Sequence, residues 1–87
     1  MTSAADDICA AFGAVVRERR MAKKLTLLDV AERSKVSCEM VRKIENGWGS
    51  KRGGTVWTFV ALAEAVGMTP SRLMAAVEKR ARNRRVA

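Results

Sequence analysis

Two short amphipathic segments joined by a tight turn constrain the fold of this chain more than any other feature. They span residues 27–33 and residues 37–46. Neither is long enough to form a stable helix alone, so each must pack against the other and against a larger core. The small side chain of Ala31 allows the two segments to approach closely. The pattern therefore predicts a pair of packed helices with the turn over residues 33–36.

Capping residues mark the ends of both segments. Thr26 and Asp29 form the pattern of a capping box, in which each side chain bonds the backbone amide of the other residue. Ser37 is a typical N-cap for the second segment, and Gly47 follows its end as a helix terminator. Within the second segment, Met40, Val41 and Ile44 are expected on one side of the helix and the polar residues on the opposite side.

A longer helix precedes the pair. It is expected to begin at a capping box of Ser3 with Asp6 and to end within residues 20–23. Its apolar stripe continues four residues beyond Val16 to Arg20, which places an arginine in line with the core face. Because a buried charge without a partner is costly, Arg20 is expected to have one.

Two helices follow the pair. One is expected between Thr55 and Gly67, and the other starts with Pro70 after Thr69 as its N-cap. The apolar side chains expected to face inward in the three longer helices are Ile8, Ala11, Phe12, Val15, Val16, Val56, Phe59, Leu62, Ala63, Val66, Leu73, Met74 and Val77. No segment of strand length alternates with period two. The prediction is an all-α, five-helix single domain over the whole chain, with a basic tail at residues 79–87.

The charge balance favours a polyanionic partner. The 87 residues include 17 lysines and arginines against 9 acidic residues, for a formal net charge of +8. Such an excess favours DNA, RNA or an anionic membrane surface. No base-stacking aromatic platform and no dominant amphipathic basic helix is present, which favours DNA. With no membrane-length apolar run and no signal-peptide pattern, a soluble cytoplasmic protein is expected.

The residue types needed for catalysis or for a metal site are scarce. The chain has no histidine, and its two cysteines, Cys9 and Cys38, lie far apart. A tetrahedral zinc site needs about four ligands, so none is expected. We find no nucleophile–base pair, no paired catalytic carboxylates and no phosphate-binding glycine loop. The expectation is a protein that is not an enzyme and holds no metal or cofactor.

Several short motifs follow one another between residues 12 and 73. They are Arg17-Glu18-Arg19-Arg20, Leu25-Thr26, Val30-Ala31-Glu32, Val36-Ser37, Val41, Ile44-Glu45-Asn46-Gly47, residues 59–67 and Met68-Thr69. In this order and spacing they resemble the phage repressor/Cro-type (Xre-like) helix-turn-helix family. The resemblance implies a compact lambda-repressor-like DNA-binding domain, with the helix-turn-helix at its second and third helices.

The resemblance also implies which side chains contact DNA. The base-reading set is Ser37, Cys38, Glu39, Arg42, Lys43 and Asn46, and the phosphate-binding set is Thr26, Lys51 and Arg52. Arginine or lysine typically reads guanine, and glutamate accepts from cytosine, so half-sites with G·C pairs are expected. Phosphate contacts position the protein without specifying sequence.

The same resemblance implies an ion pair between Arg20 and Glu45 that ties the first helix to the third. Its net stabilisation is expected to be small, because desolvation offsets the attraction. The alternative is that both residues are solvated surface charges.

Three departures from the family pattern weaken parts of this assignment. Leu27 stands where a phosphate-holding glutamine is usual, although backbone amides at that helix end still bind phosphate. Lys35 stands where the turn usually holds a glycine, which costs about 1 kcal/mol in the left-handed conformation. The glycine-rich loop over residues 47–55 is longer than usual and is a candidate for folding on DNA.

The function implied is that of a sequence-specific, double-stranded DNA-binding transcriptional regulator. The specific form expected is a homodimeric repressor on a palindromic operator, bacterial or phage-encoded and associated with the nucleoid. Its dimer surface is expected to use Leu73, Met74 and Val77, with Trp57. Two alternatives remain: an antitoxin or restriction–modification controller of the same fold, and a protein-interaction module that no longer reads bases.

Three further features each leave two interpretations open. Trp48 either packs on its own domain, which is favoured, or stacks against the DNA backbone. Trp57 and Val60 are either additional core or part of a subunit interface. The basic residues in 79–85 are either a solvated helix end or an arm on DNA.

Overall fold

The computed structural model describes residues 4–47 and 56–86, with side chains placed for residues 7–47 and 56–83. These two ranges contain five helices: α1 (Ala4–Ala22), α2 (Leu27–Ser34), α3 (Cys38–Glu45), α4 (Val56–Ala65) and α5 (Pro70–Val86). The predicted all-α helix-turn-helix fold is confirmed. None of these helices, within the two described ranges, is long and apolar enough to cross a membrane.

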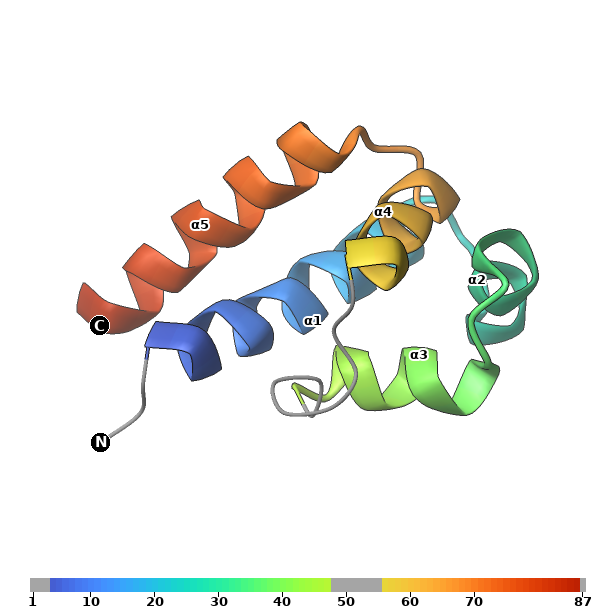
Figure 1. The fold of residues 1–87 in the computed structure, drawn as a ribbon, viewed down its shortest axis with the longest axis horizontal. Helices are drawn as coiled ribbons and strands as arrows, with labels where there is room; N and C mark the ends of the chain where they lie inside the picture. The colour runs from blue at the N-terminus through green and yellow to red at the C-terminus, as the bar shows by residue number, and fades with distance from the viewer. Residues whose placement is uncertain (1–3, 48–55, 87) are drawn as a thin grey trace.

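Helix α1 is the central element of the fold. Figure 1 shows α5 running along one side of α1 in the opposite direction, and α3 crossing on its other side. The short helix α2 stands at one end and packs against both α3 and α4. Because α1 lies between α3 and α5, the two outer helices face different sides of the molecule.

One cluster of buried side chains, the α2–α3 core, holds the short helix pair against α1 and α4. Its largest buried members are Val16, Val30, Val41, Ile44, Leu62 and Val66. Val36, from the turn, and Ala31 complete the contact between α2 and α3. Burial of this apolar surface stabilises two helices that are too short to persist alone.

A second cluster, the α1–α5 core, lies between α1, α4 and α5. Its members are Ala11, Val15, Ala63, Leu73, Val77 and Ala81. Phe12 and Phe59 pack beside it, with ring centroids 5.3 Å apart. Leu73 and Val77 have no exposed surface. The expectation that these two side chains form a dimer surface is therefore wrong, because they are the residues with which α5 packs on α1.

Two predicted caps are confirmed at the start of the short helices. Thr26 donates its backbone N–H to Asp29 Oδ2 at 2.9 Å, and the Asp29 N–H donates to Thr26 Oγ1 at 3.0 Å. The bonds from Thr26 hold the pKa of the Asp29 carboxyl below its ordinary value. At α3, the Met40 N–H donates to Ser37 Oγ at 3.1 Å. Side chains therefore satisfy amide groups that the helices leave unpaired.

The predicted end of α3, end of α4 and start of α5 also agree with the structure. Gly47 and Gly67 follow α3 and α4 with φ of 82° and 77°, a conformation that glycine adopts without steric cost. Pro70 is the first residue of α5, and Thr69 Oγ1 accepts from the Arg72 N–H at 3.2 Å.

The turn between α2 and α3 starts later than predicted. Helix α2 continues through Ser34, whose buried hydroxyl accepts from the Val36 N–H at 3.2 Å. Lys35 then adopts φ of 63°, and its N–H donates to Ala31 O at 2.9 Å. Lys35 therefore takes the left-handed conformation that usually falls to glycine.

A second lysine has the same backbone conformation. Lys24, just after α1, has φ of 58°, and the following Leu25 N–H donates to Arg20 O at 3.0 Å. This pairing ends α1 in the way that a glycine usually does. The predicted end of α1 is correct, whereas the left-handed conformation of Lys24 was not predicted.

Two apolar side chains predicted to be inside are exposed. Val56, on the first turn of α4, is 80% exposed and belongs to neither buried cluster. Met74 is 38% exposed at the edge of the α1–α5 core. The basic stretch after Val77 continues as helix to Val86 rather than leaving the domain as an arm.

Some predictions fall on positions outside the described residues. They concern Ser3, Trp48, Lys51, Arg52 and Thr55, together with the side chain of Asp6. The caps predicted at Ser3 and Thr55 and the loop contacts with phosphate stay predictions.

Candidate nucleic-acid interface

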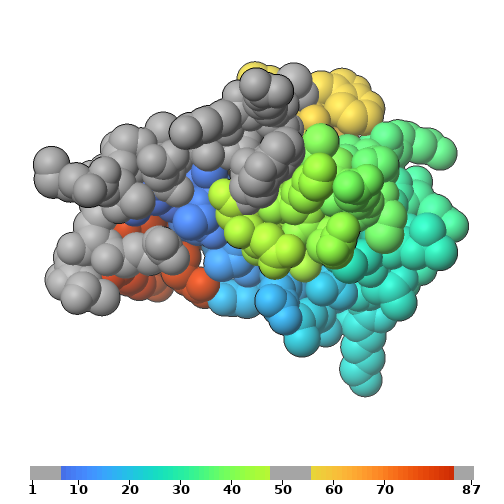
Figure 2. Space-filling view, turned by 90° about the horizontal axis from the view of Figure 1, so that it is seen from below, coloured from blue at the N-terminus to red at the C-terminus, as the bar shows by residue number. Residues whose placement is uncertain are grey.

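Helix α3 presents its polar side on the surface of the molecule. Figure 2 shows α3, in green to lime, on the face seen from below, whereas α5 shows only at one margin of this view. Four of the predicted base-reading side chains are exposed: Ser37, Glu39, Arg42 and Asn46. The opposite side of α3 is anchored by Val41 and Ile44 in the α2–α3 core. The structure thus brings these four residues together on one surface.

Cys38 does not belong fully to this surface. It is the first residue of α3, is only partly exposed, and packs against the α2–α3 core. Its predicted outward orientation is therefore only partly correct, because the first turn of α3 lies close to the core. Met40, predicted to face inward, is also partly exposed and packs beside the same core.

Glu39 and Lys43 form an ion pair along α3. Lys43 Nζ lies 3.5 Å from Glu39 Oε1, one helical turn away, and the two side chains are 41% and 68% exposed respectively. A pair this exposed contributes little to stability. It does hold each group near the other, so a DNA base that bonds Glu39 must compete with Lys43.

Ser37 has a structural role besides the predicted contact with DNA. Its hydroxyl oxygen caps α3, while the residue remains exposed at the start of the helix. A hydroxyl that accepts from an amide keeps its own hydrogen to donate. Ser37 is thus placed to donate to a phosphate or base oxygen without giving up the cap.

An ion pair fixes the far end of α3 to α1. Arg20 Nε donates to Glu45 Oε2 at 2.8 Å, and Arg20 Nη2 donates to Glu45 Oε1 at 3.1 Å. A third bond joins Arg20 Nη1 to Leu25 O at 3.0 Å. The Arg20 and Glu45 side chains are 15% and 5% exposed, so the alternative of two solvated charges is wrong.

The Arg20 guanidinium matches the carboxylate of Glu45 in the two-point geometry that arginine favours. The hydrogen bonds to Glu45 raise the pKa of Arg20 above its ordinary value, although burial acts against this. The pair joins α1 to α3, and the orientation of α3 relative to α1 determines where the outer side of α3 points. It therefore acts as a positioning contact.

Gly13 forms a second contact between α1 and α3, which the sequence analysis missed. A methyl group at Gly13 would lie 2.1 Å from Ile44 O and 3.1 Å from Glu45 O. Only glycine allows the backbones to approach this closely. The available signal was a glycine in the middle of a strong helical pattern, where it costs stability unless packing requires it.

The start of α2, where Thr26 is predicted to bind phosphate, carries the capping box. Thr26 is exposed, but its oxygen and its amide are both engaged in the capping box with Asp29. The Asp29 carboxylate also adds a negative charge where a phosphate would approach. The Thr26 hydroxyl also bonds the Asp29 carboxylate, so a phosphate at this helix end would be left mainly with the next amides of α2.

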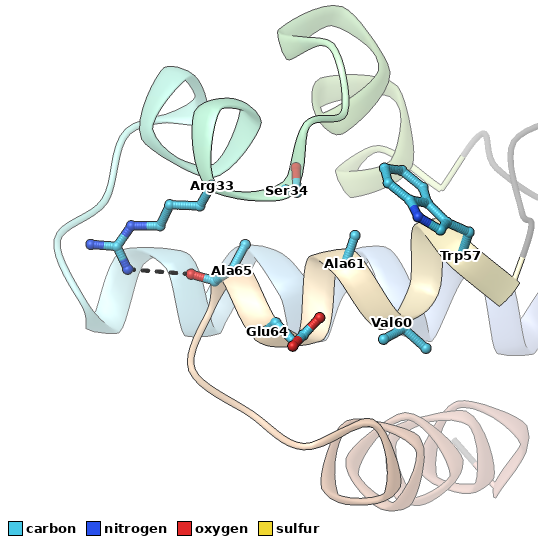
Figure 3. A pocket seen from close by; sticks show the side chains of 7 residues that line it. All are labelled: Arg33, Ser34, Trp57, Val60, Ala61, Glu64 and Ala65. Atoms are coloured by element: carbon cyan, nitrogen blue, oxygen red, sulfur yellow. Dashed lines mark hydrogen bonds between the residues drawn. The ribbon is translucent and has the colours of Figure 1, made fainter.

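A groove runs along the outer side of α4, facing the end of α2. It has a volume of about 470 Å³, and Figure 3 shows the residues that line it: Arg33, Ser34, Trp57, Val60, Ala61, Glu64 and Ala65. Arg33 Nη1 donates to Ala65 O at 3.5 Å across one end. Trp57 is 59% exposed at the other end. Trp57 is therefore not additional core.

The comparison with protein families agrees with this fold. The helix-turn-helix domain family matches residues 15–73, from the middle of α1 to the first turn of α5. A comparison with curated proteins yields no match. The matched range contains α2, the left-handed turn and α3, together with Arg20 and Glu45. This chain belongs to the helix-turn-helix domain family.

Proposed function

We propose that this protein is a sequence-specific transcriptional regulator of the phage repressor/Cro type, which binds double-stranded DNA by placing α3 in the major groove. The observation that carries the proposal is the division of α3 into two sides. The outer side carries exposed Glu39, Arg42 and Asn46, while the inner side is held by the α2–α3 core and by Glu45. Rigid mounting of polar side chains is what base reading requires.

Each outward side chain has a base edge that suits its chemistry. Arg42 donates two bonds to guanine O6 and N7, and Asn46 matches adenine N6 and N7. Glu39 accepts from cytosine N4 in competition with Lys43. Ser37 and Cys38 lie at the edge of the DNA major groove. Contacts with phosphate fall to Thr26, Lys51 and Arg52, and they set the register without specifying sequence.

The proposed assembly is a homodimer on a palindromic operator. Two copies of α3 would then lie about 34–36 Å apart, one turn of DNA. Since Leu73 and Val77 are core residues, pairing falls to the exposed apolar side chains Val56, Trp57 and Met74. Repression follows from occupancy of the operator, with no cofactor and no catalytic step. The protein would be encoded by a bacterium or a phage and would associate with the nucleoid of the bacterial cell.

Selection from a pool of random duplex DNA tests the proposal. We expect a palindromic sequence that binds at least about a thousandfold more tightly than scrambled duplex at the same salt concentration. Arg42→Ala should relax the preference at one base pair of each half-site, whereas Lys51→Ala should weaken all sequences alike. Arg17→Ala, an exposed position on α1, is the control for loss of one positive charge.

The result also separates the alternatives. Affinity that depends on salt alone, with no recovered motif, would exclude base reading and leave an interaction module of the same fold. A recovered motif whose binding is modulated by a protein partner would instead favour an antitoxin or a restriction–modification controller.

A further inference from the structure

The charge of this protein is not concentrated on its helix-turn-helix. Between residues 26 and 47 the basic residues are Arg33, Lys35, Arg42 and Lys43, and the acidic residues are Asp29, Glu32, Glu39 and Glu45. These two sets are equal in number, so this unit contributes nothing to the net charge of +8. Because phosphate neutralisation supplies most non-specific affinity for DNA, the location of the net positive charge in the rest of the chain matters for DNA binding.

Most of the excess charge lies on α5. The basic residues of α5 are Arg72, Lys79, Arg80, Arg82, Arg84 and Arg85, against the single acidic residue Glu78. Figure 1 shows this helix on the far side of α1 from α3. A duplex seated on α3 is therefore separated from the groove side of α5 by the thickness of α1.

A polar groove between α1 and α5 gathers part of this charge. It has a volume of about 290 Å³ and is lined by Val15, Glu18, Arg19, Ala76, Lys79, Arg80 and Asn83. Arg80 Nη2 lies 2.5 Å from Glu18 Oε2, which joins the two walls. Arg19 and Lys79, both exposed, add two cations beside this single carboxylate. Arg72 is exposed four residues before Ala76 and extends the same line along α5.

We infer that this α1–α5 groove is a second nucleic-acid surface, which binds the phosphate backbone of a DNA segment other than the one read by α3. Arg19, Lys79 and Arg72 would contact phosphates, while the Arg80–Glu18 pair joins the two walls of the groove. The groove offers cationic side chains and one amide, Asn83, which suits phosphate oxygens and carries no base-reading geometry. One protein molecule would then bridge two duplexes. The inference rests on the proposed function only for the identity of the first duplex.

A bead capture assay with the full chain tests this inference. The selected operator duplex is immobilised and saturated with protein, and a fluorescent duplex of unrelated sequence is then added in solution. We expect the wild-type protein to retain the second duplex, with capture falling steeply as salt rises. Arg19→Gln/Lys79→Gln should reduce this capture by about tenfold or more while leaving occupancy of the operator unchanged.

The chain provides a closely matched control. Arg17→Gln/Arg82→Gln removes the same charge from exposed positions on the same two helices, but outside the lining of the groove. It should reduce capture by less than about threefold, an effect of overall charge alone. Thermal unfolding temperatures of both double variants equal to that of the wild-type protein would show that the fold is intact.

Three outcomes would overturn the inference. The first is that the wild-type protein captures no second duplex, and the second is that both double variants lose capture equally. The third is that Arg19→Gln/Lys79→Gln loses occupancy of the operator, which would mean that the groove contacts the same duplex as α3.

The variant Arg42→Ala/Asn46→Ala distinguishes this inference from the proposed function. If it loses sequence preference yet still binds unrelated duplex through the groove, both stand. If the wild-type protein has no preference but shows groove-dependent binding, only the proposed function fails.

Discussion

The α2–α3 unit has equal numbers of acidic and basic residues, whereas α5 has six basic residues and one acidic residue. The two regions also differ in how they are held. Helix α3 is fixed to α1 by a backbone contact at Gly13 and by the Arg20–Glu45 pair, while α5 is held mainly by apolar side chains. The geometry of α3 and the net positive charge are therefore supplied by separate parts of this domain. Mutations in the two regions should therefore fail in different ways.

The largest effect is expected from Gly13→Ala, which forces α1 away from α3. The new methyl group would meet Ile44 O at 2.1 Å, and neither backbone can yield cheaply. We expect a loss of more than about 3 kcal/mol in the free energy of unfolding, measured by urea denaturation. In an open helix the same change would gain about 1 kcal/mol, so a stabilised variant would disprove the close contact.

Gly67→Ala serves as the control for this prediction. Its new methyl group would meet only the flexible end of Lys23, but φ of 77° strains any side chain. The expected loss is about 1 kcal/mol, from backbone strain alone.

Leu73→Ala tests whether α5 is part of the core or a subunit interface. Leu73 is fully buried, so truncation should cost about 3 kcal/mol of unfolding free energy at any protein concentration. Met74→Ala, at the neighbouring and partly exposed position, should cost less than about 1 kcal/mol. A stability loss at Leu73 that vanishes on raising protein concentration would instead indicate a dimer surface.

Glu45→Ala tests the ion pair that joins α3 to α1. The change leaves the largely buried Arg20 without its partner, and we expect a loss of about 2 kcal/mol in urea denaturation. The apolar double variant Arg20→Met/Glu45→Leu should recover most of this loss, because it removes both charges together. If the double variant is as unstable as the single one, packing rather than the unpaired charge causes the loss.

The smallest effect is expected at Asp29, at the start of α2. Its pKa is below the ordinary 3.8 because the Thr26 amide and hydroxyl bond the carboxylate. A lowered pKa in the folded state means that ionised Asp29 stabilises the fold above the unfolded pKa. This contribution is lost as the pH falls through the folded pKa. Asp29→Asn should therefore flatten the acid limb of the thermal unfolding profile, and an unchanged limb would exclude the contribution.

Local signals in the sequence predicted much of this fold. The capping box at Thr26, the cap at Ser37 and the terminators Gly47 and Gly67 are short-range patterns, and each has the predicted conformation. The position of Arg20 followed from helical periodicity alone. Its partner Glu45 came from the family resemblance, because periodicity within one helix says nothing about contacts to another.

The remaining features depend on the packing of distant segments. The role of Gly13 depends on where α3 crosses α1, and no pattern within α1 encodes that crossing. Leu73 and Val77 form an apolar stripe that fits a core or a dimer surface equally well until the neighbours of α5 are known. Cys38 was misjudged because one end of a short helix lies nearer the core than the helical wheel implies.

The contact at Gly13 has a consequence for how this domain can diversify. It joins α1 to carbonyl groups of α3, which every amino acid possesses, so it makes no demand on the side chains at positions 39, 42 and 46. The outer side of α3 is therefore free to be exchanged while its mount stays the same. An evolving lineage, or a library randomised at these three positions, would explore new operators without first having to find a new way to fold.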